Sequence, residues 1–502
     1  MRPALALPAA LLAGVAHTFS FAPFELWWLQ IAALAVLAHA AQEASPGRAA
    51  LLGWLFGVGW LASGLWWLYI SMHDFGGMPA WLSALAVLAL AAALALYYAA
   101  ALALWARLRC GRPLADALCW AACWLLAELA RATLFTGFPW IASGYAHAVG
   151  PLAAWAPWVG VYGLSAMAAW LACAAAVSLR TVAAPARITL GLVAVALLAG
   201  PLALRSEFTR PSGELSVSLL QPNIAQDLKF DPARIEANLK TLIRQTAAAR
   251  GALVVTPESV IPFTRAELAG GAWDELLRPF GQPGRGLLVG LFLGNPEDGF
   301  VNSVVGVAAD APGSEYRYGK RHLLPFGEFV PPGFRWFVDL MRIPLGDQAR
   351  GTSGAAFAVG GQRVRPLICY EDLFGEDIVA SVVGAEPATV FVNVSNLAWF
   401  GRWLVQDQHL QFSQMRALEF ERPVIRSTNT GATAVVDHRG RVSARLPPSS
   451  EATLEAVVQG RSGETPYARW LSALGLWPLA LLALAVLLVP RRHVRPAWRP
   501  VN

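Results

Sequence analysis

The stretch VRPLICY, from Val364 to Tyr370, sets the fold class expected for the polar half of this 502-residue chain. It is a short apolar run bounded by polar sequence, a pattern that predicts a buried β-strand. Cys369 stands near its carboxyl end and is the only cysteine in the polar half of the sequence. Its thiol is either a small buried hydrophobic group, as free cysteines often are, or a reactive nucleophile.

Runs of the same kind recur around this stretch and alternate with helical patterns. Pro232 to Arg250, Leu373 to Gly384 and Gln406 to Glu421 have apolar residues at the three- and four-residue spacing of a helix. The predicted strands are Leu215 to Gln221, Ala252 to Thr256, Gly286 to Leu293, Ser303 to Ala309, Val364 to Tyr370, Ala388 to Val394, Pro423 to Ser427 and Ala432 to Val436. This alternation predicts an α/β domain with a core of its own.

The rest of the chain has the composition of an integral membrane protein. Hydrophobic residues make up 56% of the whole sequence and charged residues only 14%, whereas soluble domains have about 25% charged residues. A membrane helix takes about 17 to 25 residues, and we expect eight such spans, centred on the apolar runs Ala4 to Phe21, Trp28 to Ala41, Ala50 to Ile70, Ala80 to Leu108, Leu114 to Leu134, Trp155 to Leu179, Ile188 to Leu204 and Trp470 to Val489. The first run could be a signal peptide, but the run that follows it and the lack of a convincing cleavage site favour a retained helix.

The net charge of +6 does not indicate a nucleic-acid-binding surface. Residues 206–468 hold 25 Lys and Arg against 28 Asp and Glu, a net charge of −3, and the remainder of the chain carries +9. The basic residues of that remainder fall in alternate loops, which places both termini in the cytoplasm. We therefore expect 1–205 to form membrane helices 1–7, 206–468 to lie outside the cytoplasm as the catalytic domain, and 469–502 to form the last helix and a cytoplasmic tail.

Three residues near the ends of predicted strands suggest a chemistry. Glu258 follows a strand directly, Lys320 lies in the polar segment YGKRH, and Cys369 ends the run described above. A thiol needs a base to take its proton and a cation to stabilise developing negative charge. Taken singly, Glu258 and Lys320 would more simply be solvated surface groups. However, Lys320 is one of only three lysines, with Lys229 and Lys240, in a chain that otherwise uses Arg.

Together these residues and their neighbours resemble the Glu-Lys-Cys triad of the nitrilase superfamily. The motifs that carry the resemblance are PE at 257–258, KRHLLPFGE from Lys320 to Glu328, and ICYE from Ile368 to Glu371. With apolar runs on both sides of such a domain, the whole chain resembles bacterial apolipoprotein N-acyltransferases. Further matching stretches are Gly137 to Trp140, Gly144 to Tyr145, Gly160 to Gly163, Gln221 to Ile224, Asn393 to Asn396, Ala398 to Gly401, Met415 to Glu419 and Arg426 to Asn429.

This resemblance implies an α-helical membrane bundle of about eight transmembrane helices plus an α/β nitrilase-like sandwich domain with α-β-β-α layers. It implies transfer of a fatty acyl chain from a phospholipid donor, phosphatidylethanolamine, to the N-terminal amine of a diacylated apolipoprotein. Glu258 would act as the base, Lys320 would hold the oxyanion, and Cys369 would carry the acyl group as a thioester. We expect a monomer in the bacterial inner membrane, with its catalytic domain on the periplasmic side. We expect no metal, cofactor or nucleic acid.

Other residues are expected to support this site or to touch substrate. Glu328, Tyr370 and Glu371 are the supporting residues. The expected substrate contacts are Phe230, Trp336, Trp399, Phe400 and Trp140. The apolar segment from Phe329 to Met341 is either part of the core or a lid that admits acyl chains. His322 and His409 are too isolated in the sequence to suggest a metal site.

The sequence departs from the family pattern beside the motifs, and two other functions stay open. Leu397 stands where Asp is common, Arg402 to Leu404 replace small and acidic residues, and Phe230 takes a position that some members fill with Trp. None of these changes touches the expected triad. The alternatives are a membrane-tethered nitrilase-type amidase or hydrolase, in which water resolves the acyl-enzyme, and a non-catalytic export scaffold with a silent Cys369.

Overall fold

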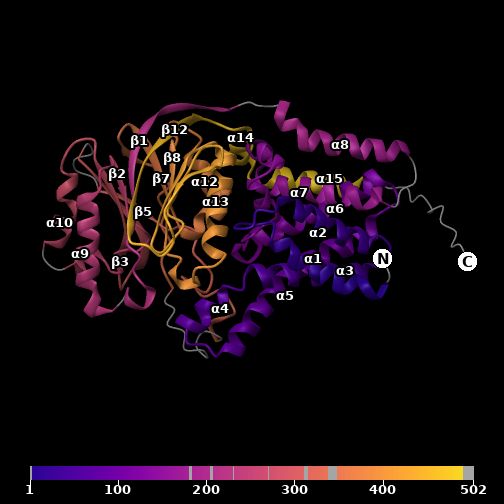
Figure 1. The fold of residues 1–502 in the computed structure, drawn as a ribbon, viewed down its shortest axis with the longest axis horizontal. Helices are drawn as coiled ribbons and strands as arrows, with labels where there is room; N and C mark the ends of the chain where they lie inside the picture. Colours follow the sequence, from indigo (N-terminus) through magenta and orange to yellow (C-terminus); the bar gives the residue numbers. More distant parts are fainter. Residues whose placement is uncertain are drawn as a thin grey trace, which may run out of the picture. The chain divides into compact units, whose positions relative to one another are not determined.

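The computed structural model describes residues 3–179, 184–203, 207–229, 231–268, 271–309, 315–336 and 347–489 (Figure 1). The chain divides into two compact units. The helical unit comprises 1–69, 79–206 and 474–502, and the catalytic unit comprises 70–78 and 207–473.

The helical unit is built from apolar helices. They are α1 (Pro3–Thr18), α2 (Trp27–Ala41), α3 (Pro46–Gly64), α5 (Ala80–Leu108), α6 (Pro113–Thr133), α7 (Ala156–Ser178), α8 (Ala184–Ala203) and α15 (Trp477–Leu488). Among the described residues, three helices are long and apolar enough to cross a membrane, or up to five if each of two bent helix pairs counts as one span. The expected eight spans are therefore not confirmed, because α1, α2 and α8 provide apolar segments of only 10–17 residues.

Small residues let these helices pack closely, as is common between helices in membranes. A Cβ atom at Gly14 of α1 would lie 2.1 Å from the carbonyl oxygen of Phe56 in α3. One at Gly53 of α3 would lie 2.5 Å from the carbonyl oxygen of Tyr98 in α5. Helix α3 is thus held between α1 and α5 by backbone contacts that any larger side chain would disrupt.

The catalytic unit contains two sheets of six strands each within the described residues. The first has the order β12 (Ala452–Gly463), β1 (Thr209–Gln221), β2 (Leu253–Val255), β3 (Gly286–Asn295), β4 (Gly299–Ala308) and β5 (Tyr316–Gly319). The second has the order β11 (Val442–Arg445), β10 (Ala434–Val436), β9 (Val424–Thr428), β8 (Val390–Ser395), β7 (Gln362–Ile368) and β6 (Phe357–Val359). Strands β1, β2 and β3 are parallel, as are β7, β8 and β9.

Helices cover the outer faces of the two sheets, so the catalytic unit has α-β-β-α layers (Figure 1). On the first sheet lie α9 (Pro232–Ala248) and α10 (Ala272–Leu277), and on the second lie α12 (Gly375–Ile378) and α13 (Val405–Phe420). Leu242 of α9 and Trp273 of α10 share one apolar cluster with strand residues such as Val254 and Leu287. Asp231 caps α9 by accepting a hydrogen bond from the Ala233 amide at 3.0 Å.

The eight predicted strands are all present, with ends shifted by a few residues, but the pattern missed β5, β6, β11 and β12. Three of these four strands are only three or four residues long, and β12 alternates polar and apolar residues irregularly because much of it is only half-buried. The predicted helix from Leu373 to Gly384 is wrong in extent. Only α12 and the short 3-10 turn Val379–Ser381 form there.

One short segment between two apolar helices belongs to the catalytic unit. Residues 70–78 contain a π-helical turn, η1 (Ser71–Phe75), that contacts the 3-10 turn η10 (Ala398–Phe400). The ring of Phe75 meets that of Trp399 edge-on, with centroids 5.7 Å apart. At Gly401, whose φ is +78°, a Cβ atom would lie 2.7 Å from Ile70 Cδ1. The two segments are therefore packed in close contact.

Candidate active site

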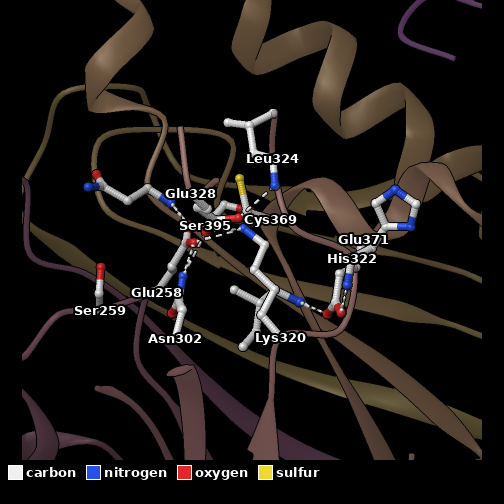
Figure 2. Close-up of polar contacts among 12 residues, drawn as sticks. Glu258, Ser259, Asn302, Lys320, His322, Leu324, Glu328, Cys369, Glu371 and Ser395 are labelled. Carbon is white, nitrogen blue, oxygen red and sulfur yellow. Dashed lines mark hydrogen bonds and ion pairs between the residues drawn. The ribbon is translucent and has the colours of Figure 1, made fainter. Parts of the chain in front are cut away.

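Three strand ends bring the candidate catalytic side chains together. Glu258 lies three residues beyond β2, while Lys320 and Cys369 follow β5 and β7 directly. The first two therefore come from one sheet and the third from the other. Figure 2 shows the Cys369 side chain beside the end of the Lys320 side chain, with Glu258 and Glu328 directed toward the same point.

Two carboxylates share the Lys320 ammonium. Lys320 Nζ lies 2.7 Å from Glu328 Oε1 and 3.4 Å from Glu258 Oε1, and its side chain is almost fully buried. Asn302 of β4 donates from Nδ2 to the same two oxygens, at 2.7 Å to Glu258 and 3.2 Å to Glu328. The other Glu328 oxygen accepts the Leu324 amide at 2.8 Å. This network fixes the ammonium and both carboxylates in one arrangement.

Glu258 is held at its second oxygen by the other sheet. Its Oε2 accepts a hydrogen bond from the Asn396 amide at 2.9 Å, and Asn396 directly follows β8. Asn302, Lys320 and the Asn396 backbone N–H therefore all donate to this carboxylate and fix its position.

Cys369 occupies a strained backbone position in a buried site. Its φ is +51°, in the left-handed region that residues other than glycine rarely adopt. Burial raises the pKa of the thiol well above its ordinary value, the Glu258 carboxylate raises it further, and the Lys320 ammonium opposes both effects. The thiol is thus protonated at rest, so its attack on a substrate requires a base to remove the proton.

Lys320 keeps its positive charge in this environment. Burial alone lowers the pKa of an ammonium, but the Glu328 and Glu258 carboxylates outweigh that effect and raise the pKa of Lys320. A permanent cation beside the sulfur is placed to stabilise negative charge on a reacting carbonyl oxygen.

Glu371 connects the loop that carries Lys320 with the strand that carries Cys369. Its Oε1 accepts the Arg321 amide at 2.7 Å and the His322 amide at 3.3 Å. Its Oε2 accepts the Ile368 amide and the Tyr318 hydroxyl, both at 2.7 Å. Glu371 therefore fixes the loop of Lys320 against the end of β7, and it does so through backbone amides and the Tyr318 hydroxyl.

Tyr370 is buried behind the site. Its ring packs against Phe374, with centroids 5.2 Å apart, and against His322 at 5.8 Å. Among the described residues no group of three or more His, Cys, Asp and Glu side chains has the arrangement of a metal site.

The expected substrate contacts come from different parts of the chain. Trp140 lies in the helical unit, buried against Trp67 with ring centroids 4.8 Å apart. Trp399 contacts Phe75, and Phe400 is half-buried beside it in η10. Phe230 lies outside the described residues.

The segment expected to be core or lid is described only over 329–336, and Phe337 to Met341 lie outside the described residues. Phe334 and Trp336 are exposed over 47% and 65% of their surface. For these two side chains the core interpretation is therefore wrong, and the lid remains a prediction. Leu397, where the family pattern commonly has Asp, is buried.

Lys229 lies beside Glu258, and the sequence did not identify it as a site residue. Lys229 Nζ donates to Ser259 Oγ at 2.8 Å and to the Glu258 carbonyl at 3.4 Å. Burial lowers the pKa of Lys229 to about 8, although the Glu258 carboxylate opposes the shift. The rarity of lysine was a signal that could have identified it. Two of the three lysines lie beside Glu258, and Lys240 is exposed in an ion pair with Glu236.

Asn302 and His409 were also overlooked as parts of the site. Asn302 lies within a strand, where sequence alone gives an Asn no distinguishing spacing. His409 is buried in α13 and its Nε2 lies 3.1 Å from the Cys369 carbonyl oxygen.

Comparisons with known proteins cover nearly the whole chain. Residues 13–174 match the family model of the apolipoprotein N-acyltransferase N-terminal domain, and residues 216–467 match that of the carbon-nitrogen hydrolases. The apolipoprotein N-acyltransferase of Ralstonia nicotianae is 48% identical over 97% of this chain and 94% of its own length. The protein of the same name from Verminephrobacter eiseniae is 47% identical over 94% of both.

Solved structures similar to this chain cover about half of it. A CN-hydrolase superfamily protein of Xanthomonas campestris aligns with 54% of this chain and 97% of its own, at 18% identity and a TM-score of 0.35. A mutant nitrilase-superfamily amidase of Nesterenkonia AN1 aligns with 51% and 93%, at 17% identity and a TM-score of 0.36. These scores are too low to support an argument, so the two-sheet carbon-nitrogen hydrolase fold rests on the family model.

Proposed function

This chain belongs to the apolipoprotein N-acyltransferase family, and from that premise we propose how Cys369, Glu258 and Lys320 perform the transfer. The chain is a membrane enzyme that acylates the amino terminus of lipoproteins. The identity of the acyl donor, the thioester intermediate and the roles of individual residues are parts of the proposal.

In the first half-reaction the acyl group moves from a phospholipid to Cys369. Glu258 takes the thiol proton as the sulfur attacks the ester carbonyl of the lipid, here phosphatidylethanolamine. Lys320 stabilises the tetrahedral oxyanion through its ammonium. The ester C–O bond then breaks, Glu258 returns the proton to the leaving oxygen, and a lysophospholipid departs. The acyl group remains on Cys369 as a thioester.

In the second half-reaction the acyl group moves to a diacylated apolipoprotein. Its N-terminal amine attacks the thioester carbonyl, Glu258 accepts a proton from the amine, and Lys320 again holds the oxyanion. The C–S bond breaks, and the sulfur recovers its proton from Glu258. An amide replaces a thioester, so the step needs no external energy source.

One observation carries this proposal: a buried ammonium contacts two carboxylates, at 2.7 and 3.4 Å, beside a buried, protonated thiol. The base and the cation that thiol chemistry requires are thus both present: Asn302 and Asn396 hold Glu258, and Glu328 and Glu258 hold Lys320. The charge pattern of the chain supports a periplasmic catalytic unit, with both termini in the cytoplasm of a multi-pass inner-membrane protein.

The test is intact-protein mass spectrometry of the purified enzyme in detergent, incubated with phosphatidylethanolamine of defined chains. We expect a mass increase of one acyl chain that hydroxylamine removes and that Cys369→Ala abolishes. Adding a synthetic diacylated lipopeptide with a free amine should discharge the adduct and yield the triacylated peptide.

Other results would support the alternatives. An adduct that water discharges as fast with the lipopeptide as without it would indicate a hydrolase. Folded wild-type protein that takes no acyl group from any phospholipid would indicate a scaffold with a silent Cys369. Circular dichroism of both proteins controls for folding.

A further inference from the structure

The carbonyl of Cys369 is held by two buried side chains from different elements. Asn393 of β8 donates to it from Nδ2 at 3.0 Å. His409 of α13 lies with Nε2 at 3.1 Å from the same oxygen. Both side chains are fully buried. The two contacts fill both lone pairs of this carbonyl oxygen, so two elements hold the peptide of the nucleophile.

The partners of His409 determine which ring nitrogen carries the proton. The Cys369 carbonyl oxygen can only accept, so Nε2 must donate. On the other side of the ring, Arg426 Nη2 contacts Nδ1, and a guanidinium can only donate, so Nδ1 must accept. Burial and the nearby Arg426 lower the pKa of His409 well below its ordinary value, in agreement with a neutral ring.

A buried ion pair between Arg426 and Asp372 holds the His409 ring in place. Arg426 Nη1 lies 3.0 Å from Asp372 Oδ2, and Ser413 donates to the same oxygen at 2.6 Å. Ser413 stands four residues after His409, on the same face of α13, and also contacts Arg426. Asp372 Oδ1 is 3.4 Å from His409 Nε2, farther than the Cys369 carbonyl is. All of these side chains are fully buried, so the ring has little freedom to move.

The contact between His409 and the Cys369 carbonyl acts on the reaction through the peptide bond between Cys369 and Tyr370. The peptide is trans and planar, so its C=O and N–H groups point in opposite directions. Fixing the carbonyl against His409 and Asn393 therefore fixes the direction of the Tyr370 N–H. In a sharp strand-to-helix turn with the nucleophile at positive φ, the N–H of the next residue is the backbone donor that reaches the oxyanion.

We infer that His409 is a positioning residue for acyl transfer, which holds the Cys369 carbonyl so that the Tyr370 N–H points at the tetrahedral oxyanion opposite Lys320. The inference rests on the proposed function, since it concerns the oxyanion of that reaction. It assigns a role to a side chain that touches neither substrate nor the reacting sulfur. Without it, the strained peptide at Cys369 can rotate and turn the N–H away.

The test compares two reactions of the same thiol in the purified full-length enzyme. Acylation by phosphatidylethanolamine passes through an oxyanion, whereas alkylation by iodoacetamide is a direct displacement at carbon and forms none. We expect His409→Leu to lower the acylation rate at saturating lipid at least about tenfold, because the Tyr370 N–H turns away from the oxyanion and the loss of one oxyanion donor costs about 10²–10³-fold. The KM for lipid and the rate of Cys369 alkylation should stay within about twofold of the wild type.

Rescue and control variants complete the design. His409→Gln can donate from its amide to the Cys369 carbonyl and accept from Arg426, so we expect it to recover part of the lost acylation rate. His438→Gln, at a histidine paired with Glu207 on the surface, should match the wild type. If His409→Leu does not fold, Asn393→Ala removes the second donor from the same carbonyl and should give the same split between acylation and alkylation.

The outcomes separate this inference from the function that it presupposes. A wild-type enzyme that takes no acyl group on Cys369 would contradict the proposed function. A wild type that is acylated, with variants whose acylation and alkylation fall by the same factor, would contradict only the inference, as would a Leu variant acylated at the wild-type rate. A Gln variant no faster than the Leu variant would also overturn it.

Discussion

Lys229 is a buried cation whose placement costs stability. Its pKa of about 8 lies about 2.5 units below that of a free lysine, a cost of about 3 kcal/mol when the side chain is charged. We expect Lys229→Met to raise the melting temperature in detergent at pH 7 and to lower the acylation rate roughly tenfold to a hundredfold, because Ser259 and the Glu258 carbonyl lose their donor.

The pH dependence of this effect has a defined sign. Below pH 8 both the folded and the unfolded chain carry the charge, and the wild type bears the full cost of burial. Between pH 8 and 10.5 the folded protein loses the proton first, so the stability advantage of the variant should shrink as the pH rises. An advantage that grows over that range would contradict the assignment. Lys240→Met, at an exposed lysine, is the control.

Glu328 balances the charge of Lys320 and fixes its position. In Glu328→Gln the closest carboxylate to the ammonium is lost, which leaves Glu258 as the remaining partner and draws Lys320 toward it. We expect acylation to fall at least about tenfold, with a melting temperature close to that of the wild type. Stopped-time acylation assays measure the rate, and Glu236→Gln on the exposed face of α9 is the matched control. Unchanged acylation in a folded variant would show that Glu328 has no supporting role.

Sequence identified the candidate catalytic side chains but not what holds them. Glu258, Lys320 and Cys369 are recognisable because each stands near a strand end within a motif, and motifs are local. Asn302 and His409 act through contacts between segments far apart in the chain, over 44 residues for Asn302 to Glu258 and 40 for His409 to Cys369. No spacing in the sequence encodes such pairs, and a lone histidine such as His409 has no metal-ligand spacing that would mark it either.

At the scale of elements, strand β3 supports the loop that carries Glu258. A Cβ atom at Gly290 would lie 2.3 Å from the Pro257 carbonyl oxygen and 2.7 Å from the Ser259 amide nitrogen, both backbone atoms that cannot move aside alone. We expect Gly290→Ala to displace Glu258 and to lower acylation roughly a hundredfold, with a loss of about 1–3 kcal/mol in stability. Acylation rate and melting temperature are the measurements.

A second glycine gives the control for that change. At Gly281 a Cβ atom would meet only the Arg278 carbonyl oxygen, at 3.9 Å, so Gly281→Ala should behave like the wild type. If both alanine variants lost activity equally, the loss at Gly290 could not be attributed to the Glu258 loop.

The central strands were predictable and the edge strands were not. Strands β7, β8 and β9 are buried along nearly their whole length and are rich in apolar and β-branched residues, so they are easily recognised. Strand β11 is mostly exposed and β5 has four residues, which leaves no periodicity to detect. The number of membrane spans was also not predictable from the sequence. Their apolar character is clear, but the apolar segments of α1, α2 and α8 have only 10–17 residues, at or below the shortest usual span.

At the scale of the whole molecule, the charge pattern predicts which parts of the chain face the periplasm. Alkaline phosphatase, which is active only outside the cytoplasm, should be active when fused after Glu464 and inactive when fused after Val489, because the expected last span, Trp470 to Val489, lies between the two points. A green fluorescent protein fused at the same two positions should give the opposite pattern. Phosphatase activity at both points would refute the assigned orientation.

The π-helical segment at 70–78 limits how this protein can be dissected. Because these residues complete the surface around Trp399 and Gly401, the catalytic unit is not one contiguous piece of the gene. A fragment spanning 207–473 would fold, if at all, with an uncovered aromatic face at Trp399. Exchange of this unit between proteins, in the laboratory or by recombination, therefore has to transfer two separate stretches of sequence together.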